Sequence, residues 1–340
     1  MESNIMANRE NTRVGLFDLH CDTLDRLALH GSPEYPACME HDEGMPAARM
    51  SSLVDNDADI AVGRMGAYEW CQCFAIFIPD ELGGEAAWNT YRKVQRFFAA
   101  QLSDNEKAIE QVRDARDIDG IVGDGRCAAM LTLENSSILD KDLQRVEILA
   151  GDGVKMATLT WNASNALASG HDTTQGLSSF GRRAVASYES AGIAVDVSHL
   201  NDKGFSDFYD IATRPFAASH SNMRAVCAHK RNLTDAQFRA IVDAKGIAGI
   251  NFCVDFLVDG GGDVTRDDML RHVDHALELG GEHALALGSD YDGADVPRWL
   301  QGEQNVVELY RLLVKEFGAD IANAVFFENA RDFFVRNERD

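Results

Sequence analysis

The feature of this sequence that most restricts its fold is a regular alternation of short apolar runs with segments of helical periodicity. The apolar runs do not alternate cleanly between polar and apolar residues, which is typical of parallel strands buried on both faces. We expect strands at eight places: 14–20, 71–78, 127–134, 154–160, 193–199, 216–220, 247–252 and 284–290.

Helical patterns lie between these runs, at 86–102, 178–191, 202–212, 234–244, 265–279 and 306–317. Thr234 followed by Gln237 predicts a capping box, and Gly192, Gly246 and Gly280 lie where helices should end. Eight strand-then-helix units predict a (β/α)8 TIM barrel, with an open doubly wound sheet as the alternative.

The chain contains no Pro-, Gly- or Ser-rich linker that would divide it. We therefore expect a polar, loose lead-in at residues 1–12 and a single barrel domain at 13–340. The irregular stretch 31–65 is the longest connection between a strand and a helix, and we expect it to cover one end of the barrel.

The amino-acid composition limits the binding partners and the cellular compartment that we expect for this protein. The formal net charge of -23 disfavours nucleic acid. Seven scattered cysteines, an odd count, argue against a disulfide framework and for a reducing, cytoplasmic location. No apolar run approaches the roughly 18 residues of a membrane span, so we expect no membrane association.

Potential metal ligands recur where the predicted strands end. The first strand ends at His20 and Asp22, whose side chains, two residues apart, can point to the same side. Later strands end at Glu134, His199, His220 and Asp290. For the first pair alone, a strand-end histidine followed by a helix-capping aspartate is an equally good reading. In a parallel barrel, however, all these ends meet around one mouth.

Three histidines and three carboxylates exceed what one tetrahedral metal needs, and they suit two metals. We expect Glu134 to bridge them, His20 and Asp22 to hold one, and His199 and His220 the other. Asp290 is then left for proton transfer. Imidazole with carboxylate favours zinc, with manganese or iron as alternatives.

Five motifs, in order along nearly the whole chain, resemble those of the membrane (renal) dipeptidase family, peptidase family M19, of the amidohydrolase-like superfamily. The opening resembles that family's HxDT, and the later segments resemble its DxSH, SHS, RN-hydrophobic-x-D and GSDxDG. They are His20–Thr23, Asp196–His199, Ser219–Ser221, Arg231–Asp235 and Gly288–Gly293.

The resemblance implies a homodimeric hydrolase with two Zn²⁺ per chain that cleaves dipeptides, including those with a C-terminal D-residue. His20, Asp22 and Glu134 would hold one zinc, and Glu134, His199 and His220 the other. Asp290 would be the acid/base for a hydroxide between the metals, and Arg231 would bind the substrate's terminal carboxylate.

Two positions depart from the family pattern at the substrate side. Trp161 stands where the family commonly has a histidine that stabilises the substrate carbonyl, and its indole N–H could still serve an oxyanion. Cys253 stands where the family often has a tyrosine. The alternatives are therefore a binuclear hydrolase of another amide, lactone or phosphoester, and a peptide-binding barrel without turnover.

Overall fold

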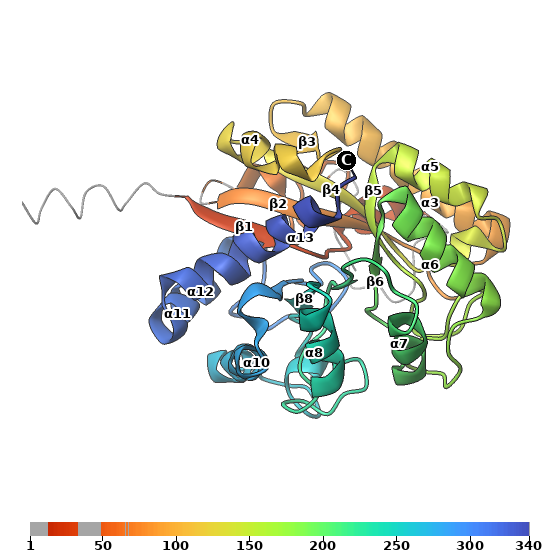
Figure 1. The fold of residues 1–340 in the computed structure, drawn as a ribbon. Coiled ribbons are helices and arrows are strands. Elements are labelled where there is room, and N and C mark those ends of the chain that lie inside the picture. The colour runs from red at the N-terminus through yellow and green to blue at the C-terminus, as the bar shows by residue number, and fades with distance from the viewer. Residues whose placement is uncertain (1–12, 33–48, 65, 67, 340) are drawn as a thin grey trace, which may run out of the picture.

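The computed structural model describes residues 13–32, 49–64, 66 and 68–339, so the predicted lead-in at 1–12 lies outside the described residues. The strands form one parallel sheet of nine (Figure 1). Their bounds are β1 Val14–Asp18, β2 Tyr68–Phe77, β3 Ile109–Gln111, β4 Cys127–Glu134, β5 Val154–Thr158, β6 Ala194–Asp196, β7 Ala217–Ala218, β8 Ile247–Ile250 and β9 Leu285–Leu287.

The sheet closes on itself. Strand β1 pairs with β2 on one side and with β9 on the other, where Asp18 is the partner of Leu287. Strand β2 pairs directly with β4, and each later strand pairs with the next. This closure confirms the predicted (β/α)8 barrel and excludes the open doubly wound sheet. The extra strand, β3, pairs with the first residues of β4 and was not predicted.

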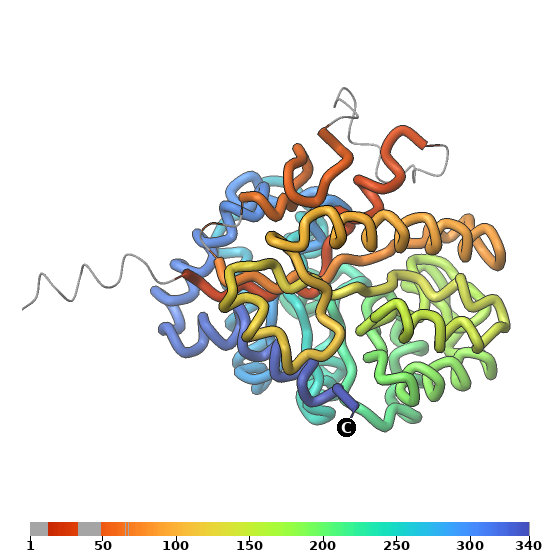
Figure 2. Tube along the Cα trace, turned by 90° about the horizontal axis from the view of Figure 1, so that it is seen from above, coloured from red at the N-terminus to blue at the C-terminus, as the bar shows by residue number. Residues whose placement is uncertain are grey.

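Helices surround the barrel (Figures 1 and 2). Their bounds are α2 Thr23–Leu29, α3 Gly84–Asp104, α4 Ile118–Gly123, α5 Gln144–Asp152, α6 Ser179–Ala191, α7 Asp202–Tyr209, α8 Asp235–Asp243, α9 Val254–Leu257, α10 Arg266–Glu278, α11 Val306–Phe317, α12 Ala319–Asn323 and α13 Asn329–Asn337, with a π-helical stretch at Ala324–Glu328. The longest, α3, runs beside the strands of the first half (Figure 2).

Local signals explain several helix ends. The predicted capping box of Thr234 and Gln237 is present at the start of α8. Gly192 ends α6 in the left-handed conformation, and Gly280 follows α10 with a φ of 89°. The expectation for Gly246 was wrong in detail, because Lys245 adopts the positive φ after α8. Gly246 is instead required for packing, since a Cβ there would lie 2.3 Å from the Phe216 carbonyl oxygen.

The barrel interior is filled from its amino-terminal end by apolar side chains. Phe17, Met130 and Met156 point inward from three strands, and Phe333 and Phe334 of α13 pack among them. Cys71 and Cys73 belong to the same interior cluster, so they share one face of β2. All six cysteines among the described residues are buried free thiols.

The described part of the long connection lies at the opposite, carboxyl-terminal end. The backbone N–H groups of Asp59 and Ile60 donate to the carboxylate of Asp292, which follows β9. Arg64 forms an ion pair with Glu303 in the connection after β9. The segment 49–64 therefore rests against the mouth of the barrel, as predicted for part of this region.

Candidate metal centre and active-site cavity

The six predicted ligand and acid/base residues converge at the mouth of the barrel. His20 and Asp22 follow β1, and Glu134 is the last residue of β4. His199, His220 and Asp290 follow β6, β7 and β9. Each of the six is at most 9% exposed, so their polar atoms face one another rather than bulk water.

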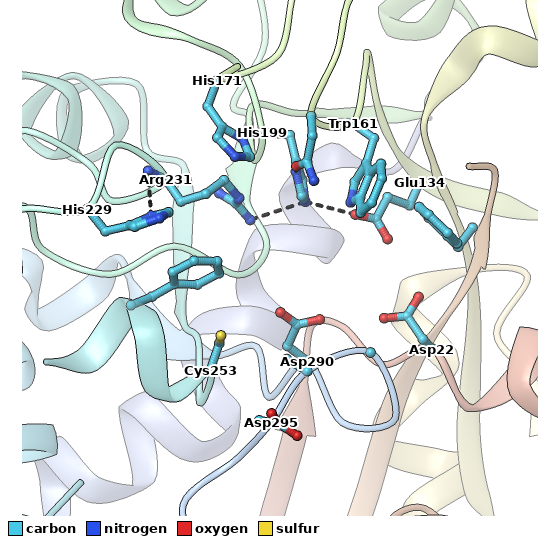
Figure 3. Close-up of a pocket in the computed structure, with 15 residues that line it drawn as sticks. Asp22, Glu134, Trp161, His171, His199, His229, Arg231, Cys253, Asp290 and Asp295 are labelled. Atoms are coloured by element: carbon cyan, nitrogen blue, oxygen red, sulfur yellow. Dashed lines mark hydrogen bonds and ion pairs between the residues drawn. The ribbon is translucent and has the colours of Figure 1, made fainter. Parts of the chain in front are cut away.

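Glu134 lies at the centre of this group and faces two sides. Its Oε1 is 2.8 Å from His199 Nε2 (Figure 3) and 3.8 Å from His220 Nε2. Its Oε2 is 3.4 Å from His20 Nε2. The two oxygens of one carboxylate thus lie next to different histidines. This is the arrangement expected of a carboxylate that bridges two cations.

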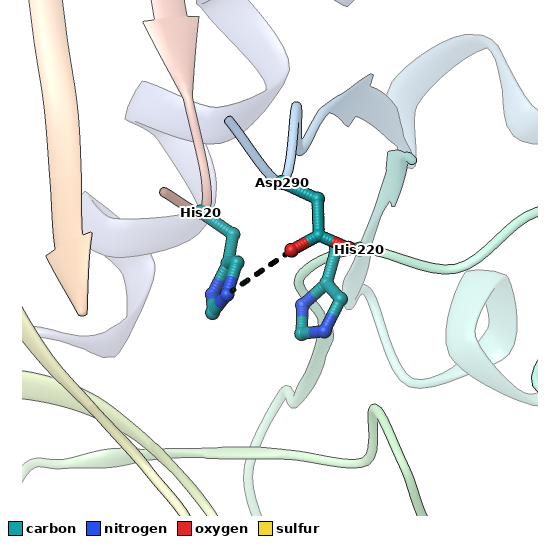
Figure 4. Close-up of side chains that lie close together, drawn as sticks. All are labelled: His20, His220 and Asp290. Carbon is teal, nitrogen blue, oxygen red and sulfur yellow. Dashed lines mark ion pairs between the residues drawn. The ribbon is translucent and has the colours of Figure 1, made fainter. Parts of the chain in front are cut away.

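His20 is surrounded by carboxylates. Its Nε2 lies 3.4 Å from Asp22 Oδ2. The same atom is 3.8 Å from Asp290 Oδ1 (Figure 4). Its ring stacks on that of His220 with centroids 3.9 Å apart. Three sets of donors lie within 4.8 Å of one another: His20, Asp22 and Glu134; Glu134, His199 and His220; and His20, His220 and Asp290.

The donor atoms fit divalent cations better than they fit one another. Among the described residues, the buried atoms His20 Nε2 and Asp22 Oδ1 have no hydrogen-bond partner. The Nε2 atoms of His199 and His220 face each other at 2.9 Å. Leaving His20 Nε2 and Asp22 Oδ1 unpaired is costly in a buried site, and a cation placed among the donor atoms would satisfy them.

The outer nitrogens of two histidines are held by neighbouring side chains. His199 Nδ1 lies 2.9 Å from the side-chain oxygen of Asn162, and His220 Nδ1 lies 2.6 Å from Ser219 Oγ. Because an amide oxygen only accepts, the proton of a neutral His199 is on Nδ1 and its Nε2 carries a lone pair. Outer partners of this kind orient metal-ligating histidines in proteins.

The electrostatics of the pocket agree with this assignment for His199 and His220. Burial, together with the positive charge of Arg231, holds the pKa of His199 well below its ordinary value, and burial does the same for His220. Both imidazoles are therefore neutral, which is the ligating form. Burial opposes charging of His20, but the carboxylates of Asp22 and Glu134 outweigh it and raise its pKa well above the ordinary value.

The pKa values of the buried carboxyl groups are raised, in contrast to those of His199 and His220. Burial raises the pKa of Glu134 to about 7, and burial also raises the pKa of Asp290. Several carboxylates cannot all ionise in so small a buried volume without compensating positive charge. The cluster therefore has the electrostatic character of a site that gains positive ions.

The backbone at this end of the barrel adopts rare conformations. His199 and Asp290 have φ values of 71° and 63°, in the left-handed region that residues other than glycine seldom occupy. Gly293 allows a close approach, because a Cβ there would lie 1.9 Å from Asp22 Oδ2. Such local strain concentrates at functional sites, where surrounding structure enforces it.

A cavity of about 340 Å³ opens beside the cluster. Arg231 is buried on one side of it, where its guanidinium donates to Ser221 Oγ and to the His220 carbonyl oxygen. Both predicted departures from the family pattern also line this cavity. Trp161 packs edge-on against Phe77, with ring centroids 4.9 Å apart, and Cys253 lies on the opposite wall (Figure 3).

Asp292 binds the long connection that follows the first strand. Its carboxylate accepts from the Arg26 guanidinium at 2.8 Å and from the Asp59 N–H at 2.8 Å. Asn251 has a comparable positioning contact, since its side-chain N–H donates to Asp290 Oδ2 at 2.8 Å.

Sequence reasoning missed two further residues of the cavity. His171 and His229 do not stand at predicted strand ends, yet both line the cavity beside Arg231. No periodicity or strand end marked His171. His229 stands two residues before Arg231, which was the only available signal.

No helix among the described residues is long and apolar enough to cross a bilayer.

The comparisons with known proteins agree with this geometry. A sequence profile of the membrane dipeptidase family (peptidase family M19) matches residues 7–329. An uncharacterized protein of Klebsiella pneumoniae, encoded in the pqqA 5' region, is 34% identical over 194 residues, covering 54% of this chain and 72% of that protein. An uncharacterized dipeptidase of Schizosaccharomyces pombe is 28% identical over 229 residues, covering 65% of this chain and 54% of that protein.

Solved structures share the fold over almost the full length. The dipeptidase AC, a metallo peptidase of family M19, superposes with a TM-score of 0.83 at 25% identity and covers 96% of this chain and 99% of its own. A metallo peptidase from Rhodobacter sphaeroides, liganded with a phosphinate mimic of L-Ala-D-Ala, gives a TM-score of 0.85 at 24% identity, covering 96% and 100%. The chain therefore belongs to the membrane dipeptidase family, peptidase family M19, and is a metallo-dipeptidase by class.

Proposed function

We propose that this protein is a binuclear zinc dipeptidase whose two metals share Glu134. The observation that carries the proposal is the divided contact of that carboxylate, with one oxygen toward His20 and the other toward His199. His20 and Asp22 would complete one site, and His199 and His220 the other. Two zinc ions there would supply Lewis acidity for the scissile carbonyl and acidify the attacking water.

Asp290 is the proposed acid/base. Asn251 holds its Oδ2, and its Oδ1 faces His20 at the edge of the cavity. Burial raises the pKa of this carboxyl, which favours a group that can accept a proton from water and return it to the leaving amine. Its left-handed backbone fixes the direction of the side chain.

Arg231 is proposed to receive the terminal carboxylate of the substrate. Its guanidinium is held over the Phe256 ring, 5.5 Å from the centroid, and by the contacts to Ser221 and to the His220 carbonyl. A planar guanidinium fixed in this way binds a carboxylate with little loss of side-chain entropy. Trp161, across the cavity, is proposed to contact the substrate near its carbonyl.

The test is a substrate panel measured together with metal content. The purified protein, loaded with zinc, is assayed on L,L- and L,D-dipeptides, esters, lactones and phosphoesters. L-Ala-D-Ala is the first candidate, because the Rhodobacter sphaeroides relative carries a mimic of it. We expect about two zinc ions per chain and hydrolysis of dipeptides.

Each alternative has its own outcome in this panel. Activity confined to esters, lactones or phosphoesters would replace the dipeptidase by another binuclear hydrolase. Dipeptide binding without turnover would support a peptide-binding barrel. The homodimer and the cytoplasmic location stay predictions, and sedimentation of the zinc-loaded protein tests the former.

A further inference from the structure

One end of the cavity is unusually rich in nitrogen atoms. His171 and His229 lie on either side of Arg231 (Figure 3), and their rings are 6.2 Å apart. The His171 ring is also 5.9 Å from that of His199. One guanidinium is enough for a terminal carboxylate, so the two additional imidazoles require another explanation.

His171 is held in place by its neighbours in the chain. The Gly170 N–H donates to the Ala163 carbonyl oxygen at 2.7 Å, and the Asp172 N–H donates to that of Asn162 at 3.0 Å. Gly170 permits the close approach, because a Cβ there would lie 1.9 Å from the Trp161 carbonyl oxygen. The loop therefore presents His171 rigidly at the edge of the cavity, as a binding residue requires.

Two buried nitrogen atoms at this end are unsatisfied. Within the described part of the chain, neither His171 Nδ1 nor Arg231 Nε has a hydrogen-bond partner. The His171 side chain is only 9% exposed, and its Nε2 is 3.9 Å from Asp172, beyond hydrogen-bond distance. Buried polar atoms left unpaired in this way indicate a missing ligand group.

His229 offers a defined donor to the same end. The Arg231 backbone N–H donates to His229 Nδ1 at 3.2 Å. The proton of the neutral imidazole is therefore on Nε2. The ring is also fixed by packing on Phe256, with centroids 4.7 Å apart.

The charges that line the cavity favour an acidic ligand group at the nitrogen-rich end. The exposed Asp295 lines another wall and repels an acidic side chain. Behind His171, the charge of Asp172 is neutralised by an ion pair with Lys230. Away from the proposed metal ligands, the nitrogen-rich end is thus the part of the cavity wall that favours an anionic group.

We propose that His171, supported by His229, is a specificity-determining residue that selects dipeptides whose C-terminal residue is aspartate or glutamate. The side-chain carboxylate would accept from these imidazoles while Arg231 receives the terminal carboxylate. The inference rests on the proposed dipeptidase function and adds to it the class of the second residue.

The experiment compares acidic dipeptides with their neutral isosteres. The zinc-loaded wild type and the His171→Phe variant are assayed on Ala-Glu and Ala-Gln, and on Ala-Asp and Ala-Asn, with the second residue in both L and D forms. Phenylalanine keeps the ring and removes both nitrogens. We expect the wild type to prefer each acidic member by about tenfold in kcat/KM, mostly through KM, as for one charged hydrogen bond.

The variant should lose that preference, so that the acid-to-amide ratio falls about tenfold. His171→Gln, which retains a donor, should restore part of the ratio. His283→Phe, at an exposed histidine outside the cavity, is the matched control and should keep the wild-type ratio. Equal preference in the wild type, or an unchanged ratio in His171→Phe, overturns the inference. No hydrolysis of any dipeptide by the two-zinc wild type overturns the proposed function itself.

Discussion

The two ends of the barrel interior use the same strands for opposite chemistry. At the amino-terminal end, Phe17 stacks on Phe334 with centroids 5.6 Å apart, inside an entirely apolar cluster. Three residues later on the same strand segment, His20 faces three carboxylates. At the amino-terminal, or lower, end the side chains pack against one another. At the carboxyl-terminal, or upper, end some buried hydrogen-bond donors and acceptors of the described residues have no partner.

The difference shows which end of the barrel stabilises the fold and which end serves ligand binding. Apolar burial at the lower end stabilises the closed sheet in proportion to the area removed from water. The upper end contains left-handed residues and crowded carboxyl groups, which cost stability unless a ligand compensates them. Substitutions at the upper end should therefore affect metal binding and turnover, and substitutions at the lower end should affect folding.

The largest effect is expected for Glu134→Gln at the upper end. The amide cannot supply two anionic oxygens to two cations, so both metals should be lost or weakened. We expect kcat/KM for L-Ala-D-Ala to fall by about 10³-fold or more. Metal analysis and steady-state kinetics measure this. Met156→Leu, a volume-conserving change in the lower cluster, should keep both metals, and retention of two zinc ions in Glu134→Gln would contradict the bridging role.

Asp290→Asn should separate catalysis from metal binding. If Asp290 transfers protons, kcat should fall by about 10²- to 10⁴-fold while both metals are retained. Steady-state kinetics with parallel metal analysis provides the measurement. A kcat near the wild-type value with both metals bound would show that another group moves the proton.

Phe334→Ala tests the lower end. The side chain is 2% exposed and packs between Phe17 and Phe333, so its removal leaves a cavity. We expect a loss of about 3–5 kcal/mol in the free energy of unfolding, measured by urea denaturation. The metal content of the folded fraction should stay at the wild-type level. Loss of metal without loss of stability would abolish the distinction between the two ends.

Ser219→Ala should have a smaller effect at the upper end. Its hydroxyl contacts His220 Nδ1 and helps to orient that ring. We expect zinc affinity to fall about 10- to 100-fold, as measured by competition with a chelator. Ser206→Ala, at an exposed serine of α7, is the control, and equal affinities in the two variants would remove the orienting role.

The smallest effect concerns the carboxyl groups beneath the long connection. Burial, assisted by Asp292, raises the pKa of Asp59 to about 7. The folded protein thus holds this proton more tightly than the unfolded chain. The contribution of Asp59 to stability therefore increases as pH falls from above 7 toward 4, and the ionised group is unfavourable at pH 8.

Asp59→Asn should accordingly raise Tm by about 2–4 °C at pH 8 and change it little near pH 5. Thermal unfolding at the two pH values measures the difference. Asp57→Asn, at an exposed neighbour, should show no such pH dependence. A lower Tm for Asp59→Asn at pH 8 would contradict the raised pKa.

The sequence predicted the barrel because its eight strands are continuous apolar runs. Strand β3, with only Ile109–Gln111, was missed because two of its three residues are polar. Strand β7 contains only Ala217–Ala218, although a run of five residues was expected, because the chain leaves the sheet as it approaches the site. Strand ends are therefore less predictable where function shapes the backbone.

The candidate site was predictable to the extent that it lies at strand ends. His20, Glu134 and His199 could be assigned to one mouth because parallel strands bring their carboxyl ends together. The position of His171 depends on the close packing of a loop on Trp161, which no local pattern encodes. The left-handed backbone of His199 was likewise not predicted, since no turn pattern in the local sequence marks it.

Anomalous diffraction from zinc-loaded crystals, collected on both sides of the zinc edge, tests the central claim most directly. We expect two zinc peaks on either side of Glu134, one about 2.0–2.2 Å from donor atoms of His20 and Asp22 and the other at that distance from His199 and His220. A single peak, or zinc bound away from Glu134, would contradict it.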